Sequence, residues 1–467
     1  MARRSSNPVV VVAAWSVTVT MALLVLWQWS VVRAVRDPEP VADPTTAASL
    51  PATAVLSVRR APGVLAWQLN GATFAEALRP VVDAVGPGSC FAASVDGRRV
   101  ASVNEALPLI PASNQKVIVA AAALDLLGPD HLFTTTVTGE VGPDGVVMGD
   151  LALIGGGDPV LSTDAWLASG VQRYPAINTT RFEDLADRIV AAGVTSVRGR
   201  IVGDANRYDD EWFIPSWDDD LYGVEGGPYD ALLVDDARQR AGADPALAAA
   251  QVLTELVEDR GIDVAFAPVA GVAAPGPVVA SVTSQPLTAI LQELLTTSDD
   301  NTAELLVKEL GVVTGGGGST AGGLAAVSSR LASWGLPLEG VVLVDGSGLS
   351  RGNLVTCNLL LGVLEQGSAS DPVGAGMAVA GTSGTLGDVF VGGPVDGRLR
   401  GKTGTLSDVK SLSGYLAAPD GSTIAFVLLQ NEPAVDDGAF LPLWEQVLAP
   451  ALATYPSGPG VSMLGPR

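Results

Sequence analysis

The chain has 467 residues, of which 48% are hydrophobic and only 16% are charged. This length and composition exclude general disorder and predict two or three folded units with sizeable cores. The formal net charge of −23 repels nucleic acid, so the sequence excludes DNA and RNA as expected partners.

The first apolar segment, residues 9–32, is long enough to span a bilayer as a helix. It is longer than the apolar part of a cleaved signal peptide, and two tryptophans and two arginines near its end are typical of membrane-interface anchors. We therefore expect an uncleaved single-pass signal anchor in the bacterial cell membrane, with residues 1–8 as a cytoplasmic tail. A buried core helix is the alternative. Residues 33–53, rich in Pro, Ala and Thr, are expected to form a linker to an extracytoplasmic catalytic domain.

After the linker, the chain has strong helix and strand patterns at both of its ends. Its middle part has shorter and weaker patterns. The patterned segments are a helix at 74–84, a hairpin at 89–103, an apolar helix at 116–128, helical spacing at 287–310, a hairpin at 411–430 and a last helix at 440–452. Short strands, glycine-rich turns and one helix at 245–259 lie between them. We expect a catalytic domain made of residues 54–135 and 286–467, with an accessory domain inserted at 136–285.

The cysteine and histidine counts restrict the possible chemistry. Cys90 and Cys357 are the two cysteines, which excludes a thiolate metal cluster. They could form one disulfide, but two buried free thiols are the favoured interpretation. The single histidine, His131, follows Gly-Pro-Asp and is interpreted as an ordinary turn residue. If the protein is a hydrolase, its base is therefore expected to be another residue.

Ser113 and Lys116 are three residues apart at the start of the apolar helix at 116–128. This spacing places the hydroxyl and the amine one turn apart on one helix face. A buried lysine can lose its proton and activate a neighbouring serine, and the helix N-terminus favours a developing oxyanion. The plainer interpretation is a serine cap with a surface lysine, but a lysine without a role is costly in an apolar helix.

Two further polar motifs follow in the chain. Residues 297–304 introduce a second helix, where Ser298 or Asp299 is either a helix cap or a site residue. Lys402-Thr403-Gly404-Thr405 precedes the hairpin at 411–430 and is expected on a strand at the sheet edge. A lysine and two hydroxyls beside a glycine suit the binding of a carboxylate, although a Lys-Thr-Gly turn alone would be unremarkable.

The order Ser-x-x-Lys, Ser-x-Asn-like and Lys-Thr-Gly resembles the motif set of penicillin-binding proteins and serine β-lactamases. The likeness covers most of residues 54–450 and includes the segments 153–159 and 345–350. The chain resembles the low-molecular-mass class C penicillin-binding proteins, which are D-alanyl-D-alanine carboxypeptidases and endopeptidases. The resemblance implies an α+β fold of the penicillin-binding/serine β-lactamase type, an antiparallel sheet flanked by helices, with a large, mostly β insertion.

The resemblance also implies acyl transfer on peptidoglycan stem peptides, with β-lactams as inhibitors and no metal or organic cofactor. Ser113 would attack the carbonyl carbon of the penultimate D-alanine, Lys116 would take its proton, and Ser298 would pass a proton to the leaving amine. Backbone N–H groups of Ser113 and Thr405 would form the oxyanion hole. The expected substrate-binding residues are Asn301, Lys402, Thr403, Gly404 and Thr405.

One position departs from the family pattern. Counted from Ala303-Glu304, the register places Asp300 where asparagine is expected, and Asn301 stands one position later. A carboxylate beside Lys116 would hold that lysine protonated and make it a poorer base. Either Asn301 takes the amide role through a local shift, or the activity is altered.

The sequence leaves three functions open. A carboxypeptidase or endopeptidase is the favoured hypothesis. A β-lactamase or esterase of the same superfamily is disfavoured by the long insertion and the expected anchor. A catalytically weakened or silent wall-binding scaffold is supported by Asp300 and opposed by Ser113, Lys116 and Lys402.

Overall fold

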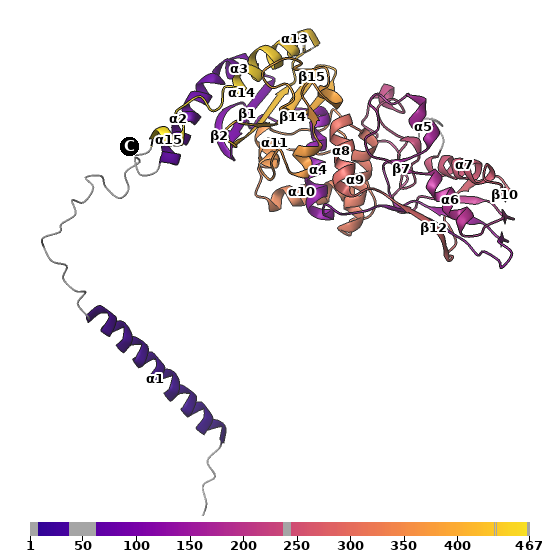
Figure 1. The fold of residues 1–467 in the computed structure, drawn as a ribbon, viewed down its shortest axis with the longest axis horizontal. Coiled ribbons are helices and arrows are strands. Elements are labelled where there is room, and N and C mark those ends of the chain that lie inside the picture. The colour runs from indigo at the N-terminus through magenta and orange to yellow at the C-terminus, as the bar shows by residue number, and fades with distance from the viewer. Residues whose placement is uncertain (1–7, 37–61, 237–243, 434, 436, 465–467) are drawn as a thin grey trace, which may run out of the picture. The chain divides into compact units, whose positions relative to one another are not determined.

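The computed structural model describes residues 8–36, 62–236, 244–433, 435 and 437–464 (Figure 1). The chain divides into two units, Met1–Ala61 and Pro62–Gly465. The described part of the first is one helix, α1 (Pro8–Arg36), and most of the predicted linker lies outside the described residues. Side chains of α1 are described at 18–32. Among the residues described to that extent, no helix is long and apolar enough to cross a membrane.

The larger unit is built on a six-stranded antiparallel sheet of order β13-β14-β15-β16-β1-β2. Its strands are β1 (Ser89–Val95), β2 (Arg98–Val103), β13 (Ala378–Val379), β14 (Leu399–Leu406), β15 (Val409–Ala417) and β16 (Thr423–Gln430). Both predicted hairpins are present. The two ends of the unit join where Ser89 of β1 pairs with Gln430 of β16.

Helices cover both faces of this sheet, so alternate residues of one strand enter different cores. Ala92 packs with the helices of one face, and Ala93 packs with those of the other. The first face carries α4 (Gln115–Leu127), α8 (Leu287–Thr297), α9 (Asp300–Val313), α10 (Thr320–Ser333), α11 (Cys357–Leu364) and α12 (Pro372–Gly376). The second carries α2 (Pro62–Ala77), α3 (Arg79–Ala84), α13 (Asp437–Pro442), the π-helical turn η6 (Leu443–Leu448) and α14 (Ala449–Leu452), and α15 (Val461–Leu464) contacts α2.

The inserted region has its own small sheets (Figure 1). It also has its own hydrophobic core. Its five-stranded sheet has the order β11-β9-β5-β3-β12, its three-stranded parallel sheet the order β10-β8-β4, and β6 pairs with β7. The strands are β3 (Thr134–Thr138), β4 (Val146–Val147), β5 (Leu151–Ile154), β6 (Leu161–Ser162), β7 (Thr180–Arg181), β8 (Ser196–Val197), β9 (Ile201–Asp204), β10 (Asp263–Val264), β11 (Val269–Ala270) and β12 (Val278–Thr283). The helices are α5 (Asp164–Ser169), α6 (Glu183–Ala191) and α7 (Pro245–Glu258). Because β3 begins at Thr134 and the insertion shares one compact unit with the main sheet, the domain boundaries at 136 and 285 stay a prediction.

A stretch of the insertion with little regular structure, residues 207–236, lies against the catalytic helices, and we call it the bridging segment. Its aromatic and aliphatic side chains share a core with Leu305 of α9 and with Leu349. Beside it, the carboxylate of the buried Glu309 accepts bonds from Arg207 at 2.6 and 2.8 Å. His131 lies in the same cluster, 3.7 Å from Glu309, and burial lowers the pKa of its imidazole.

The two cysteines form a disulfide, so the expectation of free thiols was wrong. Cys90 on β1 and Cys357 at the start of α11 are bonded across 267 residues of chain. Both are fully buried where α11 packs on the sheet. Disulfides are typical of oxidising environments, and this one ties the helical layer to β1, the strand next to the edge strand β2.

Removing this disulfide is expected to lower the stability of the unit. Because the bond closes a long loop, the Cys90→Ser/Cys357→Ser double variant should lose about 3–5 kcal/mol of unfolding free energy. Urea unfolding followed by tryptophan fluorescence measures this loss. Equal unfolding midpoints for the variant and the parent in the absence of reductant would contradict it.

Candidate active site

Ser113 lies in a single 3₁₀ turn, η2 (Ala112–Asn114), immediately before α4. Hydrogen bonds to the neighbouring strand hold this turn in place. The Ser411 hydroxyl donates to the carbonyl of Pro111 at 2.7 Å and accepts from the Asn114 amide at 2.7 Å. Ala112 adopts a left-handed conformation with φ of 47°, which is unfavourable for an alanine, so packing must maintain it.

Lys116, the second residue of α4, is fully buried one turn beyond Ser113, and its amine lies beside the Ser113 hydroxyl. Its Nζ is 3.0 Å from the Ser113 hydroxyl oxygen, 2.6 Å from Asp300 Oδ1 and 2.7 Å from the carbonyl oxygen of Ser347. An ammonium group has three donors, and each has one acceptor here. The predicted nucleophile and base are therefore within hydrogen-bonding distance, and a carboxylate is paired with the base.

Ser298 and Lys402 form a second pair. Ser298 separates α8 from α9 in a left-handed conformation with φ of 69°. Lys402 Nζ donates to its hydroxyl oxygen at 2.8 Å and to the carbonyl oxygen of Thr403 at 2.8 Å. Burial lowers the pKa of Lys402 well below its ordinary value; the charge of Lys116 lowers it further, and that of Asp300 opposes both.

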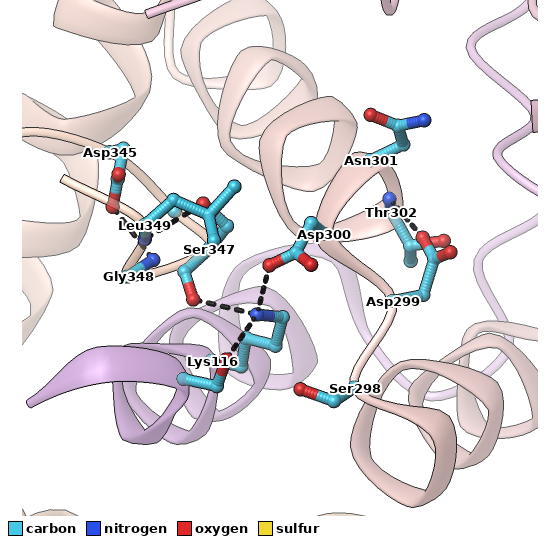
Figure 2. A network of polar contacts seen from close by, with 12 residues as sticks. Lys116, Ser298, Asp299, Asp300, Asn301, Thr302, Asp345, Ser347, Gly348 and Leu349 are labelled. Atoms are coloured by element: carbon cyan, nitrogen blue, oxygen red, sulfur yellow. Dashed lines mark hydrogen bonds and ion pairs between the residues drawn. The ribbon is translucent and has the colours of Figure 1, made fainter. Parts of the chain in front are cut away.

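Asp300 and Asn301 point in different directions (Figure 2). Asp300 faces Lys116, whereas the Asn301 side chain turns towards the bridging segment. There its amide oxygen accepts from the Gly227 backbone N–H at 2.7 Å, and its NH₂ group donates to Asp236. The structure therefore places Asp300 in the asparagine position of the motif and does not bring the Asn301 side chain to Lys116.

The predicted Lys-Thr-Gly-Thr strand lies beside the nucleophile. Ser113, Ser298, Thr403, Gly404 and Thr405 line one cleft of about 670 Å³. A Cβ atom at position 404 would come within 2.3 Å of the Ser411 hydroxyl oxygen and 2.9 Å of the Ser113 backbone nitrogen. Glycine at this position therefore lets β14 lie directly against the turn that carries Ser113.

The carboxylates around Lys116 are harder to ionise than exposed ones. Burial raises the pKa of Asp300 to about 6, although the neighbouring Lys116 lowers it. Burial and the charge of Asp345 raise the pKa of Glu304 to about 8, and burial also raises the pKa of Asp345. The site thus holds its lysines among groups whose charge depends on pH near neutrality.

Comparison with known proteins supplies the family. The model of the D-Ala-D-Ala carboxypeptidase 3 (S13) family matches residues 90–243 and 235–441. The D-alanyl-D-alanine carboxypeptidase of an Actinomadura species is 31% identical over 445 residues, covering 75% of this chain and 79% of that protein. Carboxypeptidase DacB of Mycolicibacterium smegmatis is 32% identical over 349 residues, covering 70% of this chain and 72% of its own.

This chain belongs to the S13 family. The resemblance to class C penicillin-binding proteins is therefore confirmed, and the chain is an enzyme of the serine-type D-Ala-D-Ala carboxypeptidase class. The fold prediction is confirmed too. Penicillin-binding protein 4 of Haemophilus influenzae superposes with a TM-score of 0.68 at 22% identity, over 81% of this chain and 99% of that one. A peptidoglycan endopeptidase of Bdellovibrio bacteriovorus superposes at 0.51 and 17% identity, over 79% and 93% of the two chains.

Sequence reasoning did not assign roles to three groups of this S13 site. The carbonyl of Ser347 contacts Lys116, and the carboxylates of Glu304 and Asp345 hold the loop that carries it. Segment 345–350 was recognised as family-like, so a signal was present. Its role depends on a main-chain oxygen, and a motif of side chains does not indicate where such an oxygen lies.

Proposed function

We propose that this S13 enzyme hydrolyses the D-alanyl-D-alanine bond of peptidoglycan stem peptides through an acyl-enzyme on Ser113. The observation that carries the proposal is the 3.0 Å contact between the Ser113 hydroxyl and Lys116 Nζ at the wall of an open cleft. The nearby Ser298–Lys402 pair supplies a second proton path. Relatives named D-alanyl-D-alanine carboxypeptidases support the same substrate.

The reaction requires Lys116 in its neutral amine form. In that form the Ser113 O–H donates to Lys116 Nζ, and the oxygen attacks the carbonyl carbon of the penultimate D-alanine as Nζ takes the proton. The C–N bond breaks when Ser298 gives a proton to the leaving D-alanine amine, and Lys402 stands next to Ser298 to restore it. Water then attacks the ester carbonyl carbon and the C–O bond to Ser113 breaks. The Lys116 ammonium returns a proton to the Ser113 oxygen, and the proton lost by the water replaces the one that left with the amine, so no further reactant is needed.

The substrate carboxylate would bind at β14. Thr403 and Thr405 line the cleft beside Ser113. Lys402 lies beneath, 2.8 Å from the carbonyl oxygen of Thr403. β-Lactams carry a carboxylate and a strained amide in a similar arrangement, so they should acylate Ser113 and block the enzyme.

A weakened, wall-binding protein of the same fold is the second candidate function. The contact between Asp300 and Lys116, at 2.6 Å, favours it because this carboxylate stabilises the ammonium form that cannot act as a base. Burial raises the pKa of Asp300, so this carboxylate is protonated more easily than an ordinary one. At acid pH it therefore stabilises the Lys116 ammonium less. Turnover on peptides decides between the two functions.

The test uses the purified full-length chain with a synthetic peptide ending in D-alanyl-D-alanine and with cross-linked muropeptides. Release of free D-alanine that a β-lactam stops would support a carboxypeptidase, and cleavage of the cross-link would support an endopeptidase. Peptide binding without either product would favour the wall-binding function instead.

We further propose that the enzyme is held at the cell membrane by its N-terminal segment, with the larger unit outside. The apolar run at 9–32 and the 29-residue helix α1 support this placement. A disulfide between Cys90 and Cys357 suits an extracytoplasmic domain.

Cell fractionation tests the anchor. The full-length chain should stay with membranes through high salt and alkaline carbonate and should be released by detergent. A variant that begins at Ala54 should instead appear in the aqueous fraction. Release of the full-length chain by salt alone would contradict the anchor.

A further inference from the structure

The bridging segment contacts the same two elements that surround Lys116. One is α9, which carries Asp300 on its first turn, and the other is the loop at 345–350. On α9, Lys308 Nζ is 2.6 Å from Asp209 and Asn301 binds Gly227. The insertion is thus attached directly to the supports of the catalytic lysine.

Trp217 of this segment contacts the loop at 345–350 directly. It is 3% exposed, and its indole Nε1–H donates to Asp345 Oδ2 at 2.8 Å. Its ring centroid lies 6.1 Å from that of Tyr229. A Cβ atom at Gly226 would come within 2.9 Å of the indole, so the ring is closely enclosed.

Asp345 is the first residue of the loop at 345–350, and its carboxylate holds the loop in place. Besides Trp217, its carboxylate accepts from the backbone N–H groups of Gly348 and Ser350, at 2.8 and 2.6 Å, and from Asn353 at 2.7 Å. The Gly348 contact is drawn in Figure 2. The indole is therefore one of four donors to a fully buried carboxylate, and it is the one that comes from the insertion.

Glu304 holds the same loop from α9. It lies one turn beyond Asp300 on α9, and it accepts from the backbone N–H groups of Gly346 and Ser347, the latter at 2.8 Å. The loop also packs against the turn that contains Ser113, since a Cβ at Gly348 would come within 2.0 Å of the Ala112 carbonyl oxygen. Held in this way, the Ser347 carbonyl lies 2.7 Å from Lys116 Nζ (Figure 2).

We propose that Trp217 of the insertion is a positioning residue for catalysis: its indole N–H holds Asp345, and through the loop it sets the Ser347 carbonyl against Lys116. The inference rests on the proposed role of Lys116 as the base. It makes the insertion a structural part of the catalytic centre.

Removing the N–H should have two effects on acylation. The loop relaxes and Lys116 is less well placed beside Ser113, so the maximal rate falls on the order of tenfold, as for a lost bond to a charged acceptor. The ammonium form also loses an acceptor, so the rise of the rate with pH moves to lower pH. Asp300 and Lys402 keep their own contacts in these variants, and Glu304 stays bonded to the loop. Asp345 loses one donor, and this loss raises the pKa of its carboxyl further.

The test compares three full-length proteins with wild type: Trp217→Phe, a form with 3-benzothienylalanine at position 217, and Trp212→Phe. The benzothienyl ring keeps the size of indole and replaces the N–H with sulfur. Trp212 is the matched control, because its Nε1–H donates at 3.0 Å to Asp230, which also binds Ala231 inside the bridging segment. Acylation by a fluorescent penicillin is measured against pH, and hydrogen exchange is measured for peptides covering 345–350.

Both position-217 variants should lose acylation rate, shift its pH dependence to lower pH and exchange faster at 345–350, while Trp212→Phe matches wild type. Hydrogen exchange at 345–350 that does not change in the position-217 variants would overturn the proposal. A slower acylation rate with an unchanged pH midpoint would also overturn it, because loss of folded protein lowers the rate without moving the midpoint. If the fluorescent penicillin does not label the wild-type protein, the proposed acyl-enzyme on Ser113 is contradicted. The exchange comparison then still decides whether Trp217 holds the loop.

Discussion

Ser113→Ala is expected to abolish covalent labelling by a fluorescent penicillin and to lower peptide hydrolysis on the order of 10⁴-fold or more, because no other nucleophile replaces the hydroxyl. The fold should survive the change. Lys116 keeps its bonds to Asp300 and to the Ser347 carbonyl, so no buried charge loses its partner.

The measurement is labelling of the full-length chain, followed by mass spectrometry of the modified peptide. Ser102→Ala, at an exposed position on β2, is the matched control and should label as wild type does. Labelling that persists in the Ser113→Ala protein would place the nucleophile elsewhere and would remove the proposed mechanism.

Asp300→Asn is expected to make acylation at pH 8 faster, by about tenfold for each pK unit of electrostatic stabilisation removed. The neutral amide can still accept a hydrogen bond from Lys116, but it no longer favours the ammonium form. Because the pKa of Asp300 is raised to about 6, its carboxylate is charged above that pH and protonated below it. The ratio of variant to wild-type rates should therefore be largest above pH 6 and approach one as the pH falls below 6.

Acylation rates from pH 5 to 9 test this dependence. Asp299→Asn is the control, since it removes the neighbouring charge while asparagine can still cap α9 through the Thr302 N–H. Asp299→Asn should change the acylation rate less than Asp300→Asn does. A loss of more than tenfold in Asp300→Asn at every pH would show that the carboxylate takes part in proton transfer.

The same substitution bears on the two candidate functions. If wild type turns over peptide slowly and Asp300→Asn turns it over faster, the carboxylate at this position attenuates an otherwise complete catalytic centre. If both proteins bind peptide and neither releases D-alanine, the wall-binding function is the better account of the fold.

Local sequence patterns were sufficient to predict several helices and strands of the fold. The apolar helix that ends at Gly128 and the hairpin whose turn follows Ala417 carry their own stop signals, and both are present. Helix α10 was not predicted, because Gly322 and Gly323 in its first turn lower its helical propensity and packing on α9 stabilises it. The last predicted helix is interrupted by Pro442 and a π-helical turn.

By itself, the sequence determined which reactive groups this protein has: the Ser113–Lys116 spacing, the Lys402 strand and an aspartate in the place of an amide. The tertiary structure decided which of them meet. Successive helical residues point roughly 100° apart, so the start of α9 after its cap at Asp299 turns Asp300 towards Lys116 and Asn301 away from it. The Cys90–Cys357 bond, the Ser347 carbonyl and the contact of Trp217 with Asp345 likewise join groups far apart in the chain. No local pattern encodes such contacts, because packing of the whole chain creates them.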